Sequence, residues 1–279
     1  MLANKVQNWN NKNIGDQKFK ETFINAIINN KLPNVKNLLE RMKIKNIDID
    51  FIFDFHGNMT PLMLASMQGH LEIVRELLDK GANVNVTTAD IGRTSLMWAS
   101  EDGNLDVVRE LLNKDANVNA ATTDTGMTSL MWASENGNLE IVRELLERGA
   151  NVNAARTTDG VTSLIWPSWS GHLNIVRELL DKGANVNAAM TTNGMTSLMW
   201  ASERGYLEIV ELLCQNGADP HIVNKEGKTA VNLNPGMKKF LSKGCPPMQP
   251  NTTKGGRRRK HKTKHRRNKQ SKRKSRVNK

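Results

Sequence analysis

The chain has 279 residues, with 40 Lys and Arg against 28 Asp and Glu, and a formal net charge of +12. No apolar run approaches the roughly 20 residues that a membrane-spanning helix needs, and the N-terminus lacks the apolar core of a signal peptide. Two cysteines, Cys214 and Cys245, are too few for a disulfide framework and are typical of a reducing compartment. We therefore expect an intracellular protein that does not enter a membrane, with cytoplasm and nucleus both open.

The positive charge is concentrated at one end of the chain. Residues 251–279 hold 15 of the Lys and Arg and no Asp or Glu, which leaves 25 basic and 28 acidic residues elsewhere. A self-repelling segment with almost no apolar residues cannot bury a core, so we expect a disordered basic tail over 243–279. Residues 1–16 are polar and Asn-rich, and we expect them to be disordered as well.

The first predicted unit covers residues 17–56. Apolar spacing from Phe19 to Ile27 indicates one helix, and Pro33 at a first-turn position indicates a second. Apolar and polar residues then alternate over 47–55, which predicts an extended arm whose aromatic side chains cover the open end of the next unit. We interpret this first unit as a divergent N-terminal cap.

A repeated string comes after the cap. Nearly identical sequences start at Gly92, Gly126, Gly160 and Gly194, each 34 residues after the last, with a looser copy at Gly57. Each copy predicts a Thr-Ser helix start, a short first helix with small residues, an apolar second helix, a stop glycine and an extended turn. Such a period predicts stacked units that bury their apolar faces against one another. The predicted repeats are 57–91, 92–125, 126–159, 160–193 and 194–226, and 227–242 is a degenerate C-terminal cap.

Three departures interrupt the pattern. Asp115 replaces the stop glycine, which should cost less than ~1 kcal/mol in a left-handed site. Pro167 replaces an alanine inside a first helix, which costs about 3 kcal/mol if that helix is regular. In the second helix of the repeat 194–226, Glu211 and Leu212 replace the Arg and Glu of the earlier copies.

The repeats resemble the ankyrin repeat family. The matching residues are T-P-L-M-L-A from Thr60, T-S-L-M-W-A from Thr94, Thr128 and Thr196, and H-L-E-I-V-R-E-L-L from His70. The resemblance implies an all-α solenoid of stacked helix-turn-helix units with projecting β-hairpin turns. Met or Ile stands where the family has His, so the usual Thr–His hydrogen bond is absent. The Asn-, Ile- and Lys-rich N-terminus and the Gly-Gly-basic C-terminus also resemble ankyrin proteins encoded by giant DNA viruses of amoebae, which keeps a virion or host location open.

The resemblance also implies a protein partner of unknown identity, bound on the concave face and at the hairpin tips. The concave residues would be Trp169, Glu101, Asp102, Glu135, Asn136, Glu203 and Arg204, and the tip residues Arg93, Met127, Val161 and Met195. The alternative to a binding role is that the charged residues are simply helix ends exposed to solvent. Trp169 stands where sister repeats have Glu, and either forms a binding hot spot or fills a gap made by Pro167.

Other repeated positions are interpreted as structural. Trp98, Trp132, Trp166 and Trp200 form a ladder that we expect to pack between repeats, although a base-stacking platform is conceivable. The Arg-Glu pairs of the second helices indicate a solvated charged face. No catalytic, phosphate-binding or metal-ligand spacing is present, so we expect no enzymatic activity, no cofactor and no metal.

The tail allows a second hypothesis. Its basic clusters are Arg257, Arg258, Arg259, Lys260, Lys272, Arg273 and Lys274. They could bind a nuclear-import receptor or nucleic-acid phosphates, or fold back onto the acidic concave residues. The sequence thus predicts a monomeric, non-enzymatic protein-binding scaffold, with a nucleic-acid-associated or nuclear-targeted protein as the alternative.

Overall fold

The structure, a computed structural model, describes residues 16–53, 58–241 and 245, all of which lie in the first of the chain's two units, residues 1–247. These residues form helices joined by turns, and their extended contacts are isolated antiparallel bridges such as Thr87 with Thr94. Of the ends expected to be disordered, only Asp16, which lies in a helix over 16–28, and Cys245 are described. None of the helices described is long and apolar enough to cross a membrane.

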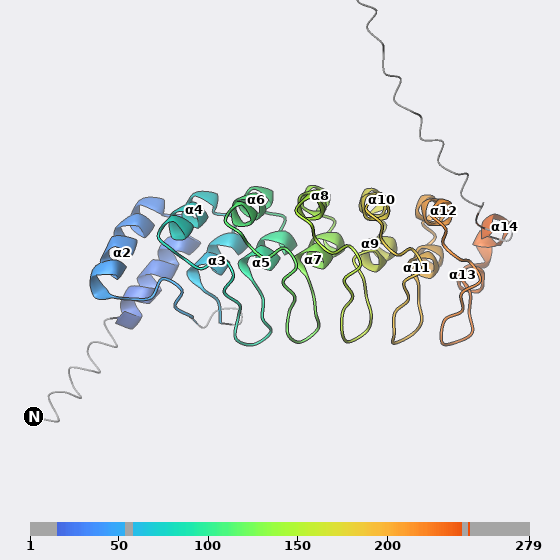
Figure 1. The fold of residues 1–279 in the computed structure, drawn as a ribbon, viewed down its shortest axis with the longest axis horizontal. Helices are drawn as coiled ribbons and strands as arrows, with labels where there is room; N and C mark the ends of the chain where they lie inside the picture. The colour runs from blue at the N-terminus through green and yellow to red at the C-terminus, as the bar shows by residue number, and fades with distance from the viewer. Residues whose placement is uncertain (1–15, 54–57, 242–244, 246–279) are drawn as a thin grey trace, which may run out of the picture. The chain divides into compact units, whose positions relative to one another are not determined.

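Helices alternate along the chain between two rows (Figure 1). After the helix over 16–28 comes α2, Leu32–Lys45. The first helices of the five predicted repeats are α3 (Pro61–Met67), α5 (Ser95–Glu101), α7 (Ser129–Glu135), α9 (Ile165–Ser170) and α11 (Ser197–Arg204). The second helices are α4 (Leu71–Asp79), α6 (Leu105–Asn113), α8 (Leu139–Glu147), α10 (Leu173–Asp181) and α12 (Leu207–Gln215). The C-terminal cap holds α13 (Ala230–Leu233), the 3-10 turn η1 (Pro235–Met237) and α14 (Lys238–Leu241).

Threonine side chains start the regular first helices, as the sequence predicts. The Thr128 hydroxyl accepts the backbone N–H of Met131 at 3.3 Å, and Thr94 and Thr196 do the same in their repeats. Each bond satisfies one of the helix-start amides that would otherwise lack a partner. The Thr-Ser motif therefore fixes where each first helix begins.

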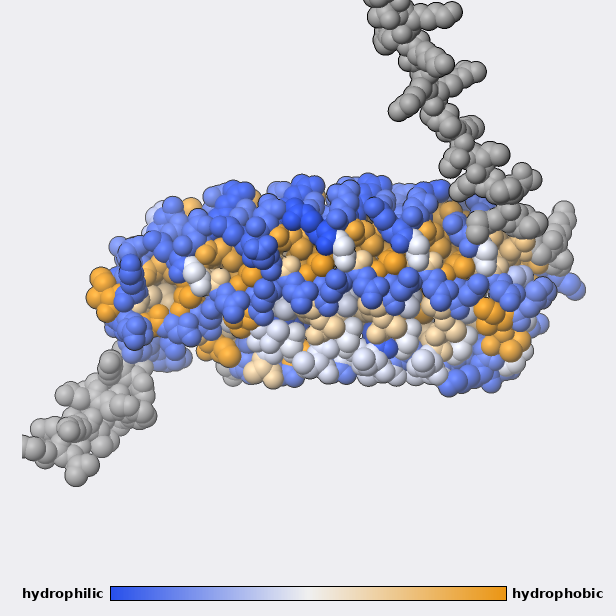
Figure 2. Space-filling model, in the orientation of Figure 1, coloured by the Kyte–Doolittle hydropathy of each residue, from blue (hydrophilic) through white to orange (hydrophobic). Residues whose placement is uncertain are grey.

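Small and branched side chains let the two rows pack closely. Ala65, Ala99, Ala133 and Ala201 are completely buried at one position of the first helices. Val74, Val108, Val142, Val176 and Val210 are completely buried at one position of the second helices. Because one buried apolar position recurs in every repeat, each unit's core continues into the next. Figure 2 shows hydrophilic surface along the row of second helices and apolar residues in the layer beneath it.

Two ladders of hydrogen bonds join successive turns. In the hairpins, the Thr157 amide donates to the Thr125 carbonyl at 2.9 Å, and three other pairs of neighbouring hairpins are bonded alike. Beside them, the Asn119 side chain donates to the Gly149 carbonyl at 3.1 Å and accepts the Asn151 amide at 2.7 Å. The same asparagine pattern recurs from Asn85 to Asp219, so the loops are held by polar bonds as well as by burial.

The second helices stop at a left-handed residue, as predicted. Gly149 has φ 86°, and Asp115 takes the same role with φ 62°. No neighbouring atom would lie within 4 Å of a Cβ at Gly149, so the site has room for a side chain and the cost at Asp115 is one of backbone conformation.

The first helix of the fourth repeat is not regular, which corrects the assumption behind the predicted 3 kcal/mol cost. α9 begins only at Ile165, with Leu164 as its N-cap and no side-chain capping bond. This late start places Pro167 in the first turn, where a backbone N–H has no intrahelical acceptor anyway. The unused Thr162 hydroxyl is buried without a hydrogen-bond partner. The proline thus costs the helix its cap and part of its first turn.

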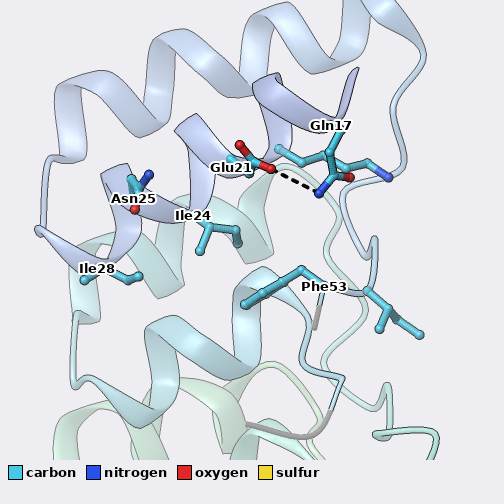
Figure 3. A pocket seen from close by; sticks show the side chains of 8 residues that line it. Gln17, Glu21, Ile24, Asn25, Ile28 and Phe53 are labelled. Atoms are coloured by element: carbon cyan, nitrogen blue, oxygen red, sulfur yellow. Dashed lines mark hydrogen bonds between the residues drawn. The ribbon is translucent and has the colours of Figure 1, made fainter. Parts of the chain in front are cut away.

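The N-terminal cap contains a side pocket (Figure 3). Phe51 is buried, and its ring centroid lies 6.2 Å from that of Phe23, so the predicted arm does bring an aromatic side chain onto the cap helices. Beside it, a cavity of about 550 Å³ is lined by apolar side chains such as Ile24 and Phe53 and has Gln17 bonded to Glu21 at its rim. Residues 54–57 of the arm lie outside the described part of the chain.

A disulfide corrects the prediction about cysteines. Cys214, buried in α12, is bonded to Cys245. The bond links the last repeat to the segment after α14, a connection that no sequence pattern predicts. The expected intracellular location stays a prediction.

Candidate functional site

The predicted concave residues lie at the C-terminal ends of the first helices, and we call this surface the first-helix face. It comprises Glu101, Asp102, Glu135, Asn136, Trp169, Ser170, Glu203 and Arg204. Each residue occupies the last turn or the cap of α5, α7, α9 or α11, so the stacking of these helices brings the set together. Asp102, Asn136, Glu203 and Arg204 are exposed, whereas Glu101, Glu135 and Trp169 are half-buried.

Carboxylates of neighbouring repeats repel one another on this face. Although the Asp102 side chain is exposed, partial desolvation raises its pKa, and the charge of Glu101 raises it further, against a smaller opposing effect of Arg93. Burial likewise raises the pKa of Glu135, where Arg156 opposes the shift and Glu101 adds to it. A group that is costly to ionise in the free protein gains from a cation placed beside it. The second and third repeats therefore form an acidic region that favours a cationic partner group.

The four predicted hairpin-tip residues are not at the tips, which corrects that part of the sequence analysis. Arg93, Met127, Val161 and Met195 are 7%, 4%, 1% and 5% exposed. They lie on the returning arm of each hairpin, directly before the threonine that starts the first helix. Alternation along an extended segment turns these side chains toward the interior. They cannot contact a partner directly.

Arg93 makes the most elaborate set of contacts near the face. Its guanidinium carbon lies 3.4 Å from the Trp98 ring centroid and 4.6 Å from that of Trp132, in the next repeat. An Nη2 of the same guanidinium donates to the Glu101 carboxylate. A planar cation suits both partners, because it stacks on aromatic rings and forms ion pairs with carboxylates. The only sequence signal for this cluster was an arginine where sister repeats have Met or Val.

The tryptophan ladder is half-buried. The indole Nε1 atoms of Trp98, Trp132, Trp166 and Trp200 are all buried and have no hydrogen-bond partner. The rings nevertheless keep part of their surface in solvent. The predicted packing between repeats accounts for the buried edges.

Trp169 contacts two neighbouring side chains and stays partly accessible. Its ring meets Trp166 edge-on at a centroid distance of 5.9 Å, which is packing beside the displaced helix start. Its face carries the guanidinium of Arg204 at 4.5 Å, and the side chain stays half-exposed. The binding hot spot stays a prediction.

The second-helix face carries a ladder of ion pairs between repeats that sequence reasoning took for a solvated charged face. Arg75, Arg109 and Arg143 bond through Nε to the glutamate 35 residues ahead, at 2.9 to 3.0 Å. Within the described residues Arg177 has no ion pair, because Leu212 stands at the next glutamate position and Asn174 replaces the acid one turn earlier. Leucine in place of glutamate at position 212 therefore ends the ladder of ion pairs.

Two further features of the sequence concern metal ligands and the basic tail. Among the residues described, no group of three or more His, Cys, Asp or Glu could hold a metal ion. The basic residues Arg257, Arg258, Arg259, Lys260, Lys272, Arg273 and Lys274 lie outside the described ranges.

Comparison with known proteins supports the fold. A family model described as ankyrin repeats (3 copies) matches residues 2–88, 23–122, 86–156 and 155–224. No curated protein matches the chain significantly. Among solved structures, the chain is similar to the ankyrin repeat domain of Bcl-3, a unique member of the IkappaB protein family. That match has 30% sequence identity and a TM-score of 0.67, and covers 76% of this chain and 93% of the other. Ankyrin repeats are generally modules for binding other proteins. On the matched repeats and the stacked helix pairs, the chain belongs to the ankyrin repeat family.

Proposed function

We propose that the protein is a non-enzymatic, monomeric scaffold or adaptor that binds a protein partner on the first-helix face. The observation that carries the proposal is the alignment of accessible, chemically different side chains from four consecutive repeats on one surface. Acidic residues occupy the second and third repeats, Trp169 the fourth, and Arg204 the fifth. Tryptophan and arginine are enriched at interface centres, and acidic side chains such as these suit the polar rim around them.

Affinity capture from the native cell tests this proposal. The double variant Trp169→Ala with Glu135→Lys removes the aromatic surface and reverses a charge of the first-helix face. Glu147→Lys makes the same charge reversal at an exposed residue of α8, and is the matched control. We expect the double variant to lose the partner and the control to keep it. Unchanged capture by the folded double variant would remove the first-helix face from the proposal.

A second candidate rests on the composition of the tail. Fifteen Lys and Arg without any Asp or Glu in residues 251–279 favour binding to nucleic-acid phosphates or to a nuclear-import receptor. Deleting these residues should abolish nucleic-acid binding that weakens with salt. Equal binding by the truncated chain would exclude the tail as the contact.

A further inference from the structure

The second repeat already contains a bound guanidinium. Arg93 lies between the rings of Trp98 and Trp132 and pairs with Glu101, and only 8% of its side chain is exposed. The indole rings and the carboxylate at the end of a first helix thus form a cradle that fits an arginine side chain. This cradle is built from residues of two neighbouring repeats, so its residue types can recur where the sequence repeats them.

The third repeat has the residue types of the cradle without the arginine. Counting 34 residues forward from Glu101, Trp98 and Trp132 gives Glu135, Trp132 and Trp166. Their first helices α7 and α9 are in contact, although α9 begins two residues later than its sister helices. The residue equivalent to Arg93 is Met127, which is buried and carries no charge. Glu135 accordingly has no ion pair among the residues described.

Two neighbouring arginines bear on this site. Arg156 opposes the upward shift in the pKa of Glu135, but its own Nε lies 3.4 Å from the Asp159 carboxylate. Arg204 lies on the ring of Trp169, which stands edge-on to Trp166. Thus the nearby rings of Trp132 and Trp169 already hold the guanidinium groups of Arg93 and Arg204, while Glu135 has no ion pair among the described residues.

We propose that Glu135, with the Trp132 and Trp166 rings beside it, receives an arginine side chain of the partner protein. The inference rests on the proposed protein-binding function and specifies the chemistry of the partner. Arginine fits better than lysine, because a planar guanidinium can stack on an indole while two of its N–H groups meet a carboxylate. The occupant of the second-repeat cradle is itself an arginine.

A short synthetic peptide tests the chemistry without knowledge of the partner. The full-length protein is titrated with acetyl-Gly-Gly-Arg-Gly-Gly-amide, and the indole N–H signals of its six tryptophans are followed by NMR. We expect the signals of Trp132 and Trp166 to shift, and the lysine peptide to bind more weakly. Glu135→Gln should weaken arginine-peptide binding about tenfold or more, because a charge-assisted pair is lost. Glu147→Gln, the same change at an exposed residue of α8 outside the first-helix face, should have no such effect. Equal binding by the Glu135→Gln protein would overturn the proposal.

Filling the cradle from inside is the sharper test. Met127→Arg copies into the third repeat the residue that occupies the cradle of the second, and should abolish both the peptide shifts and capture of the partner. Met195→Arg places the same side chain at the equivalent buried position two repeats further on, and should leave the peptide shifts of Trp132 and Trp166 unchanged. Circular dichroism and thermal melting verify that each variant is folded. Undiminished peptide binding by folded Met127→Arg protein would refute the assignment.

The outcomes separate this inference from the proposed function. If the double variant of the first-helix face loses the partner but Met127→Arg and Glu135→Gln still bind the peptide normally, the arginine cradle is wrong and the face remains. If the peptide behaves as expected but the double variant still captures the partner, the proposed function fails. The full-length variant Arg257→Gln, Arg258→Gln, Arg259→Gln tests the chain's own tail. A rise in its peptide affinity would identify the tail as occupant and overturn the assignment to a partner.

Discussion

Replacing Pro167 by alanine should stabilise the fourth repeat. With a backbone N–H at position 167 and no ring, α9 can begin two residues earlier, as its sister helices do. The Thr162 hydroxyl, now buried without a partner, could then cap the helix, which contributes about 1 kcal/mol. The new amide could donate to the Ser163 carbonyl, for about another 1 kcal/mol. Against this, the unfolded chain regains the freedom that proline removes, which costs ~0.4–1 kcal/mol.

The net expectation is a gain of about 1 kcal/mol, or roughly 2–4 °C in Tm for a folded unit of this size. Calorimetry measures the midpoint. Hydrogen exchange at the amide of Trp166 reports whether the earlier start has formed, because the equivalent Trp132 amide donates to the Thr128 carbonyl. Ala133→Pro is the reciprocal change, made in a repeat whose cap from Thr128 to Met131 is intact. It should lower Tm and release that cap. A lower Tm for Pro167→Ala, with unchanged exchange at Trp166, would refute the view that the proline displaced the helix start.

Three further changes test other features of the repeats. Asp115→Gly should raise stability by about 0.5–1 kcal/mol in urea unfolding, because glycine adopts the left-handed conformation without a steric cost; a loss would contradict this. Arg143→Ala should lower Tm more than Arg177→Ala, since the first breaks pairs with two glutamates and the second breaks none in the described residues; equal losses would show that the ladder contributes nothing. By NMR, Glu135 should titrate above its usual 4.5, and Glu101→Gln should bring the midpoint down.

The titration of Glu135 also has a definite sign for stability. Its pKa is raised in the folded state, so the ionised form is disfavoured there relative to the unfolded chain. Its unfavourable contribution is therefore full at neutral pH. It is relieved as the pH falls through the folded pKa toward the unfolded value. Glu135→Gln should accordingly be at least as stable as the parent protein at pH 7, with the difference vanishing in acid.

The fold could be predicted from sequence because the same local signals recur in phase. The threonine caps, the buried alanines and valines and the left-handed stops each depend on residues close in the chain, and repetition revealed which of them matter. Pro167 and Asp115 could be recognised for the same reason, since each replaces a repeated residue. It was predictable that both replacements cost stability. The later start of α9 was not predictable, because it depends on which conformations the neighbouring turn tolerates.

The candidate site was only partly predictable. The first-helix ends were expected from the family pattern, whereas the burial of Arg93 and Met127 depends on the direction of a side chain within a short extended arm. The Arg75–Glu110 type of ion pair joins residues 35 apart, and nothing in one repeat reveals that its arginine reaches the next. The bond between Cys214 and Cys245 depends on how the chain turns after α14, where the repeated pattern has ended.

The asparagine and hairpin ladders have an evolutionary consequence. Every one of their bonds joins a residue of one copy to a residue of the adjoining copy, 30 or 32 positions away along the chain. Recombination between such similar copies could therefore add or delete a whole period while leaving the surroundings of the remaining residues unchanged. A length change of any other size would put all the ladders out of register at once. Copy number is thus free to drift in a lineage, while the few irregular positions, such as Arg93 and Pro167, serve as fixed landmarks by which an individual copy can be traced.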